Sequence, residues 1–397
     1  TLMQTTSNRT YIRSQENTVE DTESRLTQEN TSGLFKVTAA YTPNAKTHLE
    51  YGAFVKASSI TELDNRTSDF GVVSNDLTEL NDKNPFSLDQ NLMGYFTLND
   101  KNILSVESSF NYKKQVPEYL LNTDTQPLGS LIPLSPSETF RIHQDKTITT
   151  NAFQGEMNYY YMLNKTNHLS VNAGINNSQQ QLDTEILQEL DNGISTTIDN
   201  GNLDNDVAYN FQDYYTGIRY KTKMGDLTFS PGVTWHHYQV TDTQLSTKNT
   251  LNKRLFTPDL FAKYDFASNK NLTLNYRLNA QFTDVQNIAA RGVMRNYNSW
   301  YTGNRNIENL LYHQINVNFF NFNMFNHTNL FVTANYQKRY NDIIESISYS
   351  GTDRLSSPQN VPIWNDQLMT NMSFEKKFVN VKITAASNLS YSRFQNE

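Results

Sequence analysis

Long runs of alternating apolar and polar residues, joined in turn by short and long polar links, are the feature that most limits how this chain folds. In the clearest run every second residue is apolar, namely Leu272, Leu274, Tyr276, Leu278, Ala280 and Phe282. Successive side chains of a strand point to opposite faces, so such a run has one apolar and one polar face. A strand of about ten residues with an apolar face is long enough to cross a bilayer at a tilt. The pattern therefore predicts membrane-spanning β-strands.

The average composition of the chain resembles that of a soluble acidic protein. It has 397 residues, a formal net charge of −7 and a mean hydropathy of −0.65. In a transmembrane β-barrel only alternate residues face lipid, so a hydrophilic average is compatible with membrane insertion. No run approaches the roughly 18 consecutive apolar residues of a transmembrane helix. The 23 Tyr and 22 Phe suit strands and interfacial girdles.

Several classes of function are disfavoured by composition and motifs. The chain has no Cys, which removes disulfides, thiolate metal sites and cysteine nucleophiles. It has no basic run that would bind nucleic acid. No nucleophile elbow, P-loop or dinucleotide fingerprint is present, and the seven His show no metal-ligand spacing. We therefore expect no enzyme activity, no cofactor and no metal centre.

The period-2 runs predict about fifteen strands in an antiparallel up-and-down β-barrel. Tight links are expected at residues 42–44, 99–101, 164–167, 224–226, 268–270, 326–328 and 378–380. Long links are expected at residues 62–84, 117–147, 184–206, 242–252, 286–308 and 347–361. Bacterial barrels place short turns in the periplasm and long loops outside the cell, which gives the expected orientation.

Tandem soluble β-sandwiches are the alternative architecture. Their strands mostly have about five or six residues, with turn signals every eight to twelve. The runs of this chain are often longer, and this favours the membrane barrel. No linker or shift in composition divides the chain, so we expect one β-barrel domain over residues 1–397.

Residues 276–344 contain a long alternating run, then a loop with Gly303, Asn304, Ile307 and Glu308, then a second run and a tight turn. This arrangement resembles the barrel of TonB-dependent outer-membrane receptors of the Bacteroidota. Loops of that family commonly carry Gly-Asn-Pro, then an apolar residue and a nearby glutamate, and Arg305 occupies the usual proline position. The hairpin rhythm extends the resemblance over essentially the whole chain.

The resemblance implies a barrel of about twenty-two strands around an N-terminal plug. It implies TonB-dependent uptake of a specific nutrient ligand through the outer membrane of a Gram-negative bacterium. The expected partners are outer-membrane lipids, the plug, the TonB complex and a surface lipoprotein that acts as a lid. Neither a plug nor a TonB-contacting segment is recognised in the sequence, and fifteen strands are too few. We therefore expect an internal piece of a larger barrel, cut at both ends.

The predicted loop at 286–308 is the best candidate for ligand contact. It combines three guanidinium groups, which pair with carboxylate or phosphate, with three aromatic rings, which stack on sugars or macrocycles. These residues are Arg291, Arg295, Arg305, Tyr297, Trp300 and Tyr301. The alternative is that the rings pack the loop against its neighbours while the arginines are solvated.

The acidic loop at 183–206 is a weak candidate for Ca²⁺, because hard carboxylate oxygens are dense there. Its best ligands are Asp199, Asp204 and Asp206, although the loop lacks EF-hand spacing. A solvated acidic loop is the preferred interpretation.

The polar face of the strands is expected to line the barrel interior. Its members include Arg277, Asn279, Gln281, Asn316, Asn318, Glu107 and Lys113. The predicted function is thus a receptor barrel. The rivals are a passive porin with a constriction loop, a surface barrel such as an adhesin or secretion component, and a soluble carbohydrate-binding β-protein.

Overall fold

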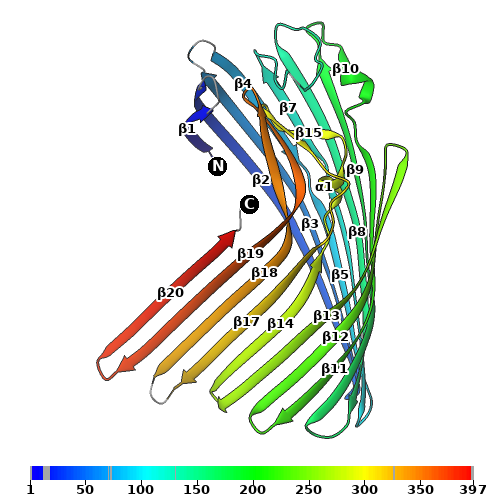
Figure 1. Cartoon of the computed structure of the whole chain (residues 1–397), viewed down its shortest axis with the longest axis vertical. Helices are drawn as coiled ribbons and strands as arrows, with labels where there is room; N and C mark the ends of the chain where they lie inside the picture. Colours follow the sequence, from blue (N-terminus) through cyan, green and yellow to red (C-terminus); the bar gives the residue numbers. More distant parts are fainter. Residues whose placement is uncertain are drawn as a thin grey trace.

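The computed structural model describes residues 2–11, 18–69, 71, 74–129, 131–324 and 327–394, which form one strongly curved sheet of twenty strands (Figure 1). The strands are β1 (Leu2–Tyr11), β2 (Thr18–Asn44), β3 (Thr47–Asp69), β4 (Ser74–Lys83), β5 (Phe86–Asn99), β6 (Asn102–Gln115), β7 (Pro117–Thr123), β8 (Phe140–Met162), β9 (Asn167–Glu189), β10 (Ser195–Thr197), β11 (Asp206–Met224), β12 (Leu227–Gln244), β13 (Thr247–Ala267), β14 (Lys270–Gln281), β15 (Gly292–Asn296), β16 (Ser299–Thr302), β17 (Leu310–Asn323), β18 (Thr328–Ser350), β19 (Asp353–Phe378) and β20 (Val381–Phe394). A 3-10 helix η1 (Ile198–Gly201) and an α-helix α1 (Val285–Ile288) lie in the connections. None of the described helices has the length and apolar character needed to cross a membrane.

The wall of the sheet contains fifteen antiparallel paths. β4 and β5 form one path interrupted at Asn84 and Pro85, and β6 and β7 form another interrupted at Val116, because the register with their neighbours continues unchanged. β10 pairs with β9 above β11 and continues the path of β11, whereas the short strands β15 and β16 lie inside the curve. Twenty strands, less three for the joined pairs and two for the inner strands, leave fifteen, which agrees with the prediction of about fifteen.

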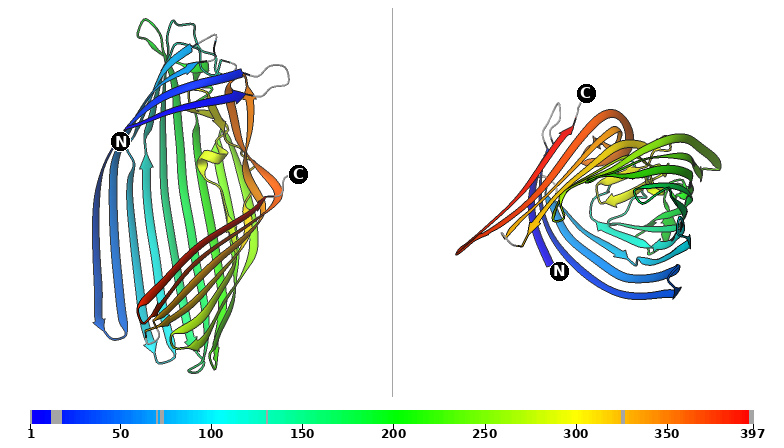
Figure 2. Two further views of the ribbon diagram at one scale, coloured as in Figure 1. Left: turned by 90° about the vertical axis from the view of Figure 1, so that its left-hand side faces the viewer. Right: turned by 90° about the horizontal axis from the view of Figure 1, so that it is seen from below.

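The two edges of the wall are not paired with each other in the described part of the chain. β1 pairs with β2 alone, and β20 pairs with β19 alone. Figure 2 shows the resulting open curve from below. Among the described strands a single parallel pairing occurs, between β16 and the upper part of β19.

The tight turns gather at the lower end of the sheet in Figure 1, as the sequence predicts. They lie at residues 45–46, 100–101, 163–166, 225–226, 268–269 and 379–380, and the link at 326–328 lies partly outside the described residues.

The prediction of long links was wrong at three places in the upper half. β3 and β4 fill most of 62–84, β12 and β13 are separated only by Leu245 and Ser246, and β18 and β19 only by Gly351 and Thr352. At 117–147 and 184–206 strands also occupy much of the expected loop. Leu245 and Ser246 both have positive φ, 51° and 56°, as a tight two-residue hairpin turn requires. They lack the Asn-Gly signal that identifies such turns.

Halfway along the wall strands, the apolar side chains change from the outer face to the inner face of the sheet. In the lower half of β9, Val171 and Ile175 point outward, and Asn172 lines an interior cavity. In its upper half Leu182 and Ile186 point inward, with exposed fractions of 1% and 0%. The pairing of β9 with β8 runs without a bulge, so every second residue keeps facing the same side along the whole strand. The apolar residues therefore move from the outward-facing to the inward-facing positions of the sequence.

The outward apolar face is therefore most continuous in a band around the lower half of the wall, although single leucines such as Leu80, Leu120 and Leu187 also lie on the outer face above it. On β13 the band runs from Phe256 to Tyr264, a span of about nine residues, the length of a tilted transmembrane strand. Above it, outward positions such as Asn252 and Thr250 are polar and exposed. The upper halves of the strands thus extend beyond the lipid, which explains why they were predicted as loops.

The run of outward-facing apolar residues predicted at 272–282 ends before Phe282. β14 stops at Gln281, and the ring of Phe282 turns into the interior. Its centroid lies 5.1 Å from that of Phe211 and 4.8 Å from that of Tyr238, both on the inner face. Phe282 therefore belongs to the interior core.

A charge in this band is expected to cost far more than a charge above it. Leu260→Arg, at the middle of the outward band, should lower the free energy of unfolding by about 2–4 kcal/mol. Thr250→Arg, on the same face of β13 above the band, should change it by no more than about 0.5 kcal/mol. Denaturant unfolding of the full chain from lipid vesicles measures both. Equal losses would place the membrane boundary elsewhere.

Candidate functional site

Residues 284–308, here called the inner segment, fold into the upper interior of the sheet. Asp284 caps α1, because its side chain accepts hydrogen bonds from the backbone N–H groups of Gln286 and Asn287 at 3.0 and 3.1 Å. β15 and β16 then form a hairpin whose second strand pairs in parallel with residues 354–356 of β19. The segment thus crosses the interior from the strands that precede it to the far side of the wall.

The inner segment packs on the inward apolar side chains of the upper wall. One cluster joins Met294, Tyr297 and Trp300 to a larger set on β4, β7, β8, β9 and the upper connections, namely Leu77, Tyr119, Leu121, Leu128, Ile132, Ile142, Ile186 and Ile198. A second joins Val285, Ile288 and Ala289 to Ile148, Leu182, Val207 and Tyr209. This packing is the reason for the reversal of the hydrophobic pattern, because the upper wall has its core on the inside.

Amide side chains of the wall replace strand pairing along the inner segment. Gln144 on β8 donates to the carbonyl of Met294 at 3.0 Å and accepts from its N–H at 2.8 Å. Asn205 donates to the carbonyl of Arg291 at 3.1 Å and accepts from its N–H at 3.2 Å. Each amide therefore satisfies a buried backbone donor and acceptor that the hairpin leaves open.

Gln244 at the end of β12 makes the same kind of contact near α1. It donates to the carbonyl of Ile288 at 3.0 Å and accepts from the N–H of Ala290 at 2.8 Å. Gln180 of β9 accepts from the N–H of Val285 at 3.0 Å. These amides were not singled out in the sequence. Such residues can be recognised as Gln or Asn at inward-facing positions of the upper wall, where the other inward-facing residues are apolar.

The tip of the inner segment is bound by two buried carboxylates. Glu79 of β4 accepts from the N–H of Tyr297 at 2.8 Å and from the hydroxyl of Tyr119 at 2.5 Å. The hydroxyl of Tyr297 donates to Glu20 of β2 at 2.6 Å. The guanidinium of Arg66 lies 5.2 Å from the centre of the Tyr297 ring and 3.8 Å from Glu79. The contacts connect the tip to β2, β3, β4 and β7.

The predicted ligand-contact residues lie in or beside this segment but not in one group. The guanidinium of Arg295 lies 3.8 Å from the centre of the Tyr301 ring and 2.9 Å from Glu345. Arg291 donates to the carbonyls of Gly201 and Asp204 at 3.2 and 2.5 Å. The three aromatic side chains are buried, with exposed fractions of 6% or 7%.

Arg305 is separate from the other two arginines. It pairs with the buried Asp242 of β12 at 2.7 Å and donates to the hydroxyl of Thr247 at 2.7 Å. All three arginines are thus engaged by the protein itself. Ligand contact by these residues stays a prediction.

The family-like motif forms the exit of the inner segment. The N–H of Gly303 donates to the carbonyl of Ala289 at 2.9 Å, and Asn304 donates to the carbonyl of Pro358 on β19 at 3.1 Å. Ile307 is buried, and Glu308 pairs with Lys253 at 2.7 Å. The motif therefore positions the segment between β19 and β13.

The predicted Ca²⁺ ligands do not converge. Asp199, Asp204 and Asp206 are not among the described side chains that form a metal-sized group of acidic and histidine ligands. Asp204 instead accepts from the N–H of Ile186 at 3.0 Å, and the guanidinium of Arg291 occupies the neighbouring carbonyls. Calcium binding remains a prediction.

The lower interior is polar, as predicted for the alternate face of the strands. A cavity of about 1190 Å³ is lined by Glu107, Arg277 and Asn279, which confirms these three expectations. Arg219 forms an ion pair with Asp259 in its wall, and Nδ1 of His236 lies 3.0 Å from Asp213.

A second cavity, of about 580 Å³, lies between the inner segment and the wall. Four cationic side chains line it, Lys83, Lys146, Arg291 and Arg295, against the single carboxylate of Asp284. Burial and the nearby Arg295 lower the pKa of Lys146. Two of these cations are paired with carboxylates beyond the lining, Lys83 with Glu62 and Arg295 with Glu345.

The arrangement of strands matches solved transport proteins. The chain is similar to the copper transporter OprC, with a TM-score of 0.59, 10% identity and coverage of 99% of this chain and 62% of that one. It has the fold of outer-membrane β-barrel receptors. The ferric citrate transporter FecA aligns with a TM-score of 0.52, 9% identity and coverage of 96% and 58%. The ferric yersiniabactin uptake receptor FyuA from Yersinia pestis aligns with 0.52, 8%, 96% and 60%.

The chain spans about three fifths of the length of these structural relatives. No protein-family model matches it, and no curated protein matches its sequence. The likeness therefore concerns the fold.

Gly303→Ala is expected to loosen the inner segment. A Cβ at this position would lie 2.6 and 2.7 Å from the backbone N and O of Ala289, so the chain there must shift. We expect a loss of about 1–3 kcal/mol in the free energy of unfolding, with faster proteolysis of residues 284–308. Gly52→Ala is the matched control, since a Cβ there meets nothing within 4 Å. Parent-like protease resistance of Gly303→Ala would contradict the close approach.

The attachment of the tip is expected to strengthen as the pH falls. Burial raises the pKa of Glu79 above its ordinary value of 4.5, and this outweighs the opposing contacts with Tyr119, Arg66 and Tyr297. The folded state thus binds a proton more readily than the unfolded state, so stability rises as the pH drops through the raised pKa towards 4.5.

Glu79→Gln keeps an acceptor oxygen but does not titrate. The parent should therefore gain stability relative to this variant between pH 7.5 and 4.5, measured by denaturant unfolding at each pH. A difference that is constant with pH would show that Glu79 keeps the same charge in both states.

Proposed function

We propose that this chain is the barrel of an outer-membrane receptor that takes up a specific nutrient ligand in a TonB-dependent manner. The observation that carries the proposal is the wall itself, with a lipid-facing band outside, a polar lower interior and an upper interior filled by the inner segment. A filled barrel is suited to a receptor, which opens on demand. The similarity to two transporters and an uptake receptor supports the same conclusion.

The proposed location is the outer membrane of a Gram-negative bacterium of the Bacteroidota. The tight turns would face the periplasm, and the upper ends of the strands would face outward. Lipids, an N-terminal plug, the TonB complex and a surface lipoprotein lid are the proposed partners. They rest on the resemblance of the sequence to the receptor family.

Ligand contact is proposed at the cavity beneath the inner segment. Arg291, Arg295 and Tyr301 line it, together with Lys146. Guanidinium and ammonium groups bind carboxylate or phosphate oxygens through charge-assisted hydrogen bonds. An anionic group on the ligand would therefore match this part of the interior.

A passive porin is the second candidate, and the inner segment is the observation that favours it. A porin needs a loop folded into its lumen as a constriction, and residues 284–308 enter the interior in this way. The two functions differ in conductance and in their need for TonB.

The natural protein purified from outer membranes is expected to show no steady conductance in planar bilayers bathed in KCl. It should also bind the purified periplasmic domain of TonB in a pull-down assay. A receptor is closed at rest, whereas a porin is an open, ohmic channel. Steady conductance without TonB binding would overturn the receptor in favour of the porin.

A further inference from the structure

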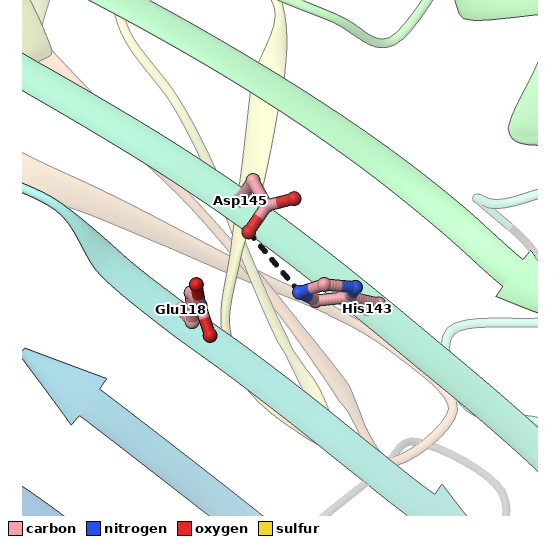
Figure 3. A group of neighbouring side chains, drawn as sticks. All are labelled: Glu118, His143 and Asp145. Atoms are coloured by element: carbon pink, nitrogen blue, oxygen red, sulfur yellow. Dashed lines mark ion pairs between the residues drawn. The ribbon is translucent and has the colours of Figure 1, made fainter.

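A histidine and two carboxylates meet on the outer surface of the upper wall. Glu118 lies on β7, and His143 and Asp145 lie on the neighbouring β8, all on the same face of the sheet (Figure 3). One ligand atom of each lies within 4.8 Å of the others, and no other such group occurs among the described residues. Tyr119 and Gln144, their sequence neighbours, point into the core, so the three face outward.

The imidazole of His143 has a buried nitrogen without a hydrogen bond. Its Nε2 lies 3.1 Å from Oδ1 of Asp145 but is not in hydrogen-bonding geometry with any described group. A buried polar atom in this condition is unfavourable unless another partner binds it. A ligand bound at this nitrogen would supply the missing partner.

A row of four carboxylates crosses the same position. Asp82, Glu118, Asp145 and Glu185 are successive partners in the register of β4, β7, β8 and β9. Like charges directly opposite each other on neighbouring strands are destabilising. A bound cation would remove this repulsion.

In the described rows above and below, His143 is the one basic side chain, and its Nε2 lies 3.1 Å from Asp145. The row above consists of Leu80, Leu120, His143 and Leu187, and the row below includes Thr147 and Asp183. Arg141 lies one row further up β8, where its guanidinium is 3.4 Å from Glu189.

We propose that Glu118, His143 and Asp145 bind a divalent transition-metal ion, with Zn²⁺ as the best-matched species. Imidazole nitrogen and carboxylate oxygen are both ligands of Zn²⁺, and beside three protein ligands a water completes the tetrahedron. Such a tetrahedron needs ligand atoms about 3.3 Å apart. The ligand atoms here lie within 4.8 Å of one another, and those of His143 and Asp145 are 3.1 Å apart. Calcium takes oxygen ligands alone and would not use His143.

The metal would join β7 to β8 above the membrane band. β7 has seven residues, pairs with β4 on one side and β8 on the other, and is followed by the connection at 124–139. A ligand from each strand would hold this end of the sheet together. The spacing of the histidines from one another does not reveal this group. Its ligands on β8 are a histidine and an aspartate, His143 and Asp145, which lie two residues apart and therefore share a face.

Calorimetric titration of the full chain in detergent with ZnCl₂ tests the site. The parent should bind one Zn²⁺ with an affinity that falls at least about tenfold in His143→Asn and in Glu118→Gln. His48→Asn is the matched control, because His48 pairs with a single carboxylate, Glu50, at 2.7 Å. This variant should bind Zn²⁺ like the parent.

Thermal melts with and without ZnCl₂ give a second measurement. Zn²⁺ should raise the melting temperature of the parent and of His48→Asn, but not that of His143→Asn. Melts without metal show whether each variant folds. Equal Zn²⁺ binding by the parent and His143→Asn would overturn the proposal. The proposal would also be overturned if Ca²⁺ bound as tightly as Zn²⁺ and its binding did not depend on His143. Such a result would show that the row of carboxylates attracts cations by charge alone.

Discussion

Every face of a strand must match what it meets at each height, and this constraint organises the whole molecule. A strand cannot turn its side chains over without a bulge, and β9 pairs with β8 without one. The sequence of β9 therefore changes instead, with Ile175 outward in the lipid band and Ile186 inward above it. Inward apolar side chains in an empty barrel would be exposed to water. The inner segment covers them, so the upper wall and the inner segment depend on each other.

The lower half of each strand could be predicted from local sequence, and the upper half could not. In the lower half, the apolar residues of the run from Leu272 to Ala280 face the lipid and the polar residues between them face the interior, so the alternation predicts the strand. Above the band both faces of β18 and β19 carry many polar side chains, so the pattern fades and resembles a loop. The two-residue turn at Leu245 and Ser246 has no glycine or asparagine, so the sequence did not predict the long hairpin there.

The placement of the inner segment depends on contacts between residues far apart in sequence. Gln144 and Met294 are separated by 150 positions, and Glu79 and Tyr297 by 218. No local rule connects them, because a glutamine on a strand is equally suited to a solvated face. The sequence did identify residues 286–308 as special through Trp300, Tyr301 and the arginines. Its prediction of an outer loop was wrong, since the aromatic side chains are buried beneath the wall.

The way the inner segment is attached determines what its movement would cost. Its backbone joins the wall ladder through three residues of β16 and the adjacent carbonyl of Asn298, and side-chain amides and Glu79 bind other backbone groups of the segment. Each such bond contributes about 0.5–1.5 kcal/mol net, because water replaces it when the segment leaves. The apolar contacts of Val285, Ile288 and Trp300 have no such replacement, and the wall side chains beneath them would be exposed as well. The barrier to opening is therefore mainly hydrophobic, and a ligand that displaces the segment must cover the same inner face.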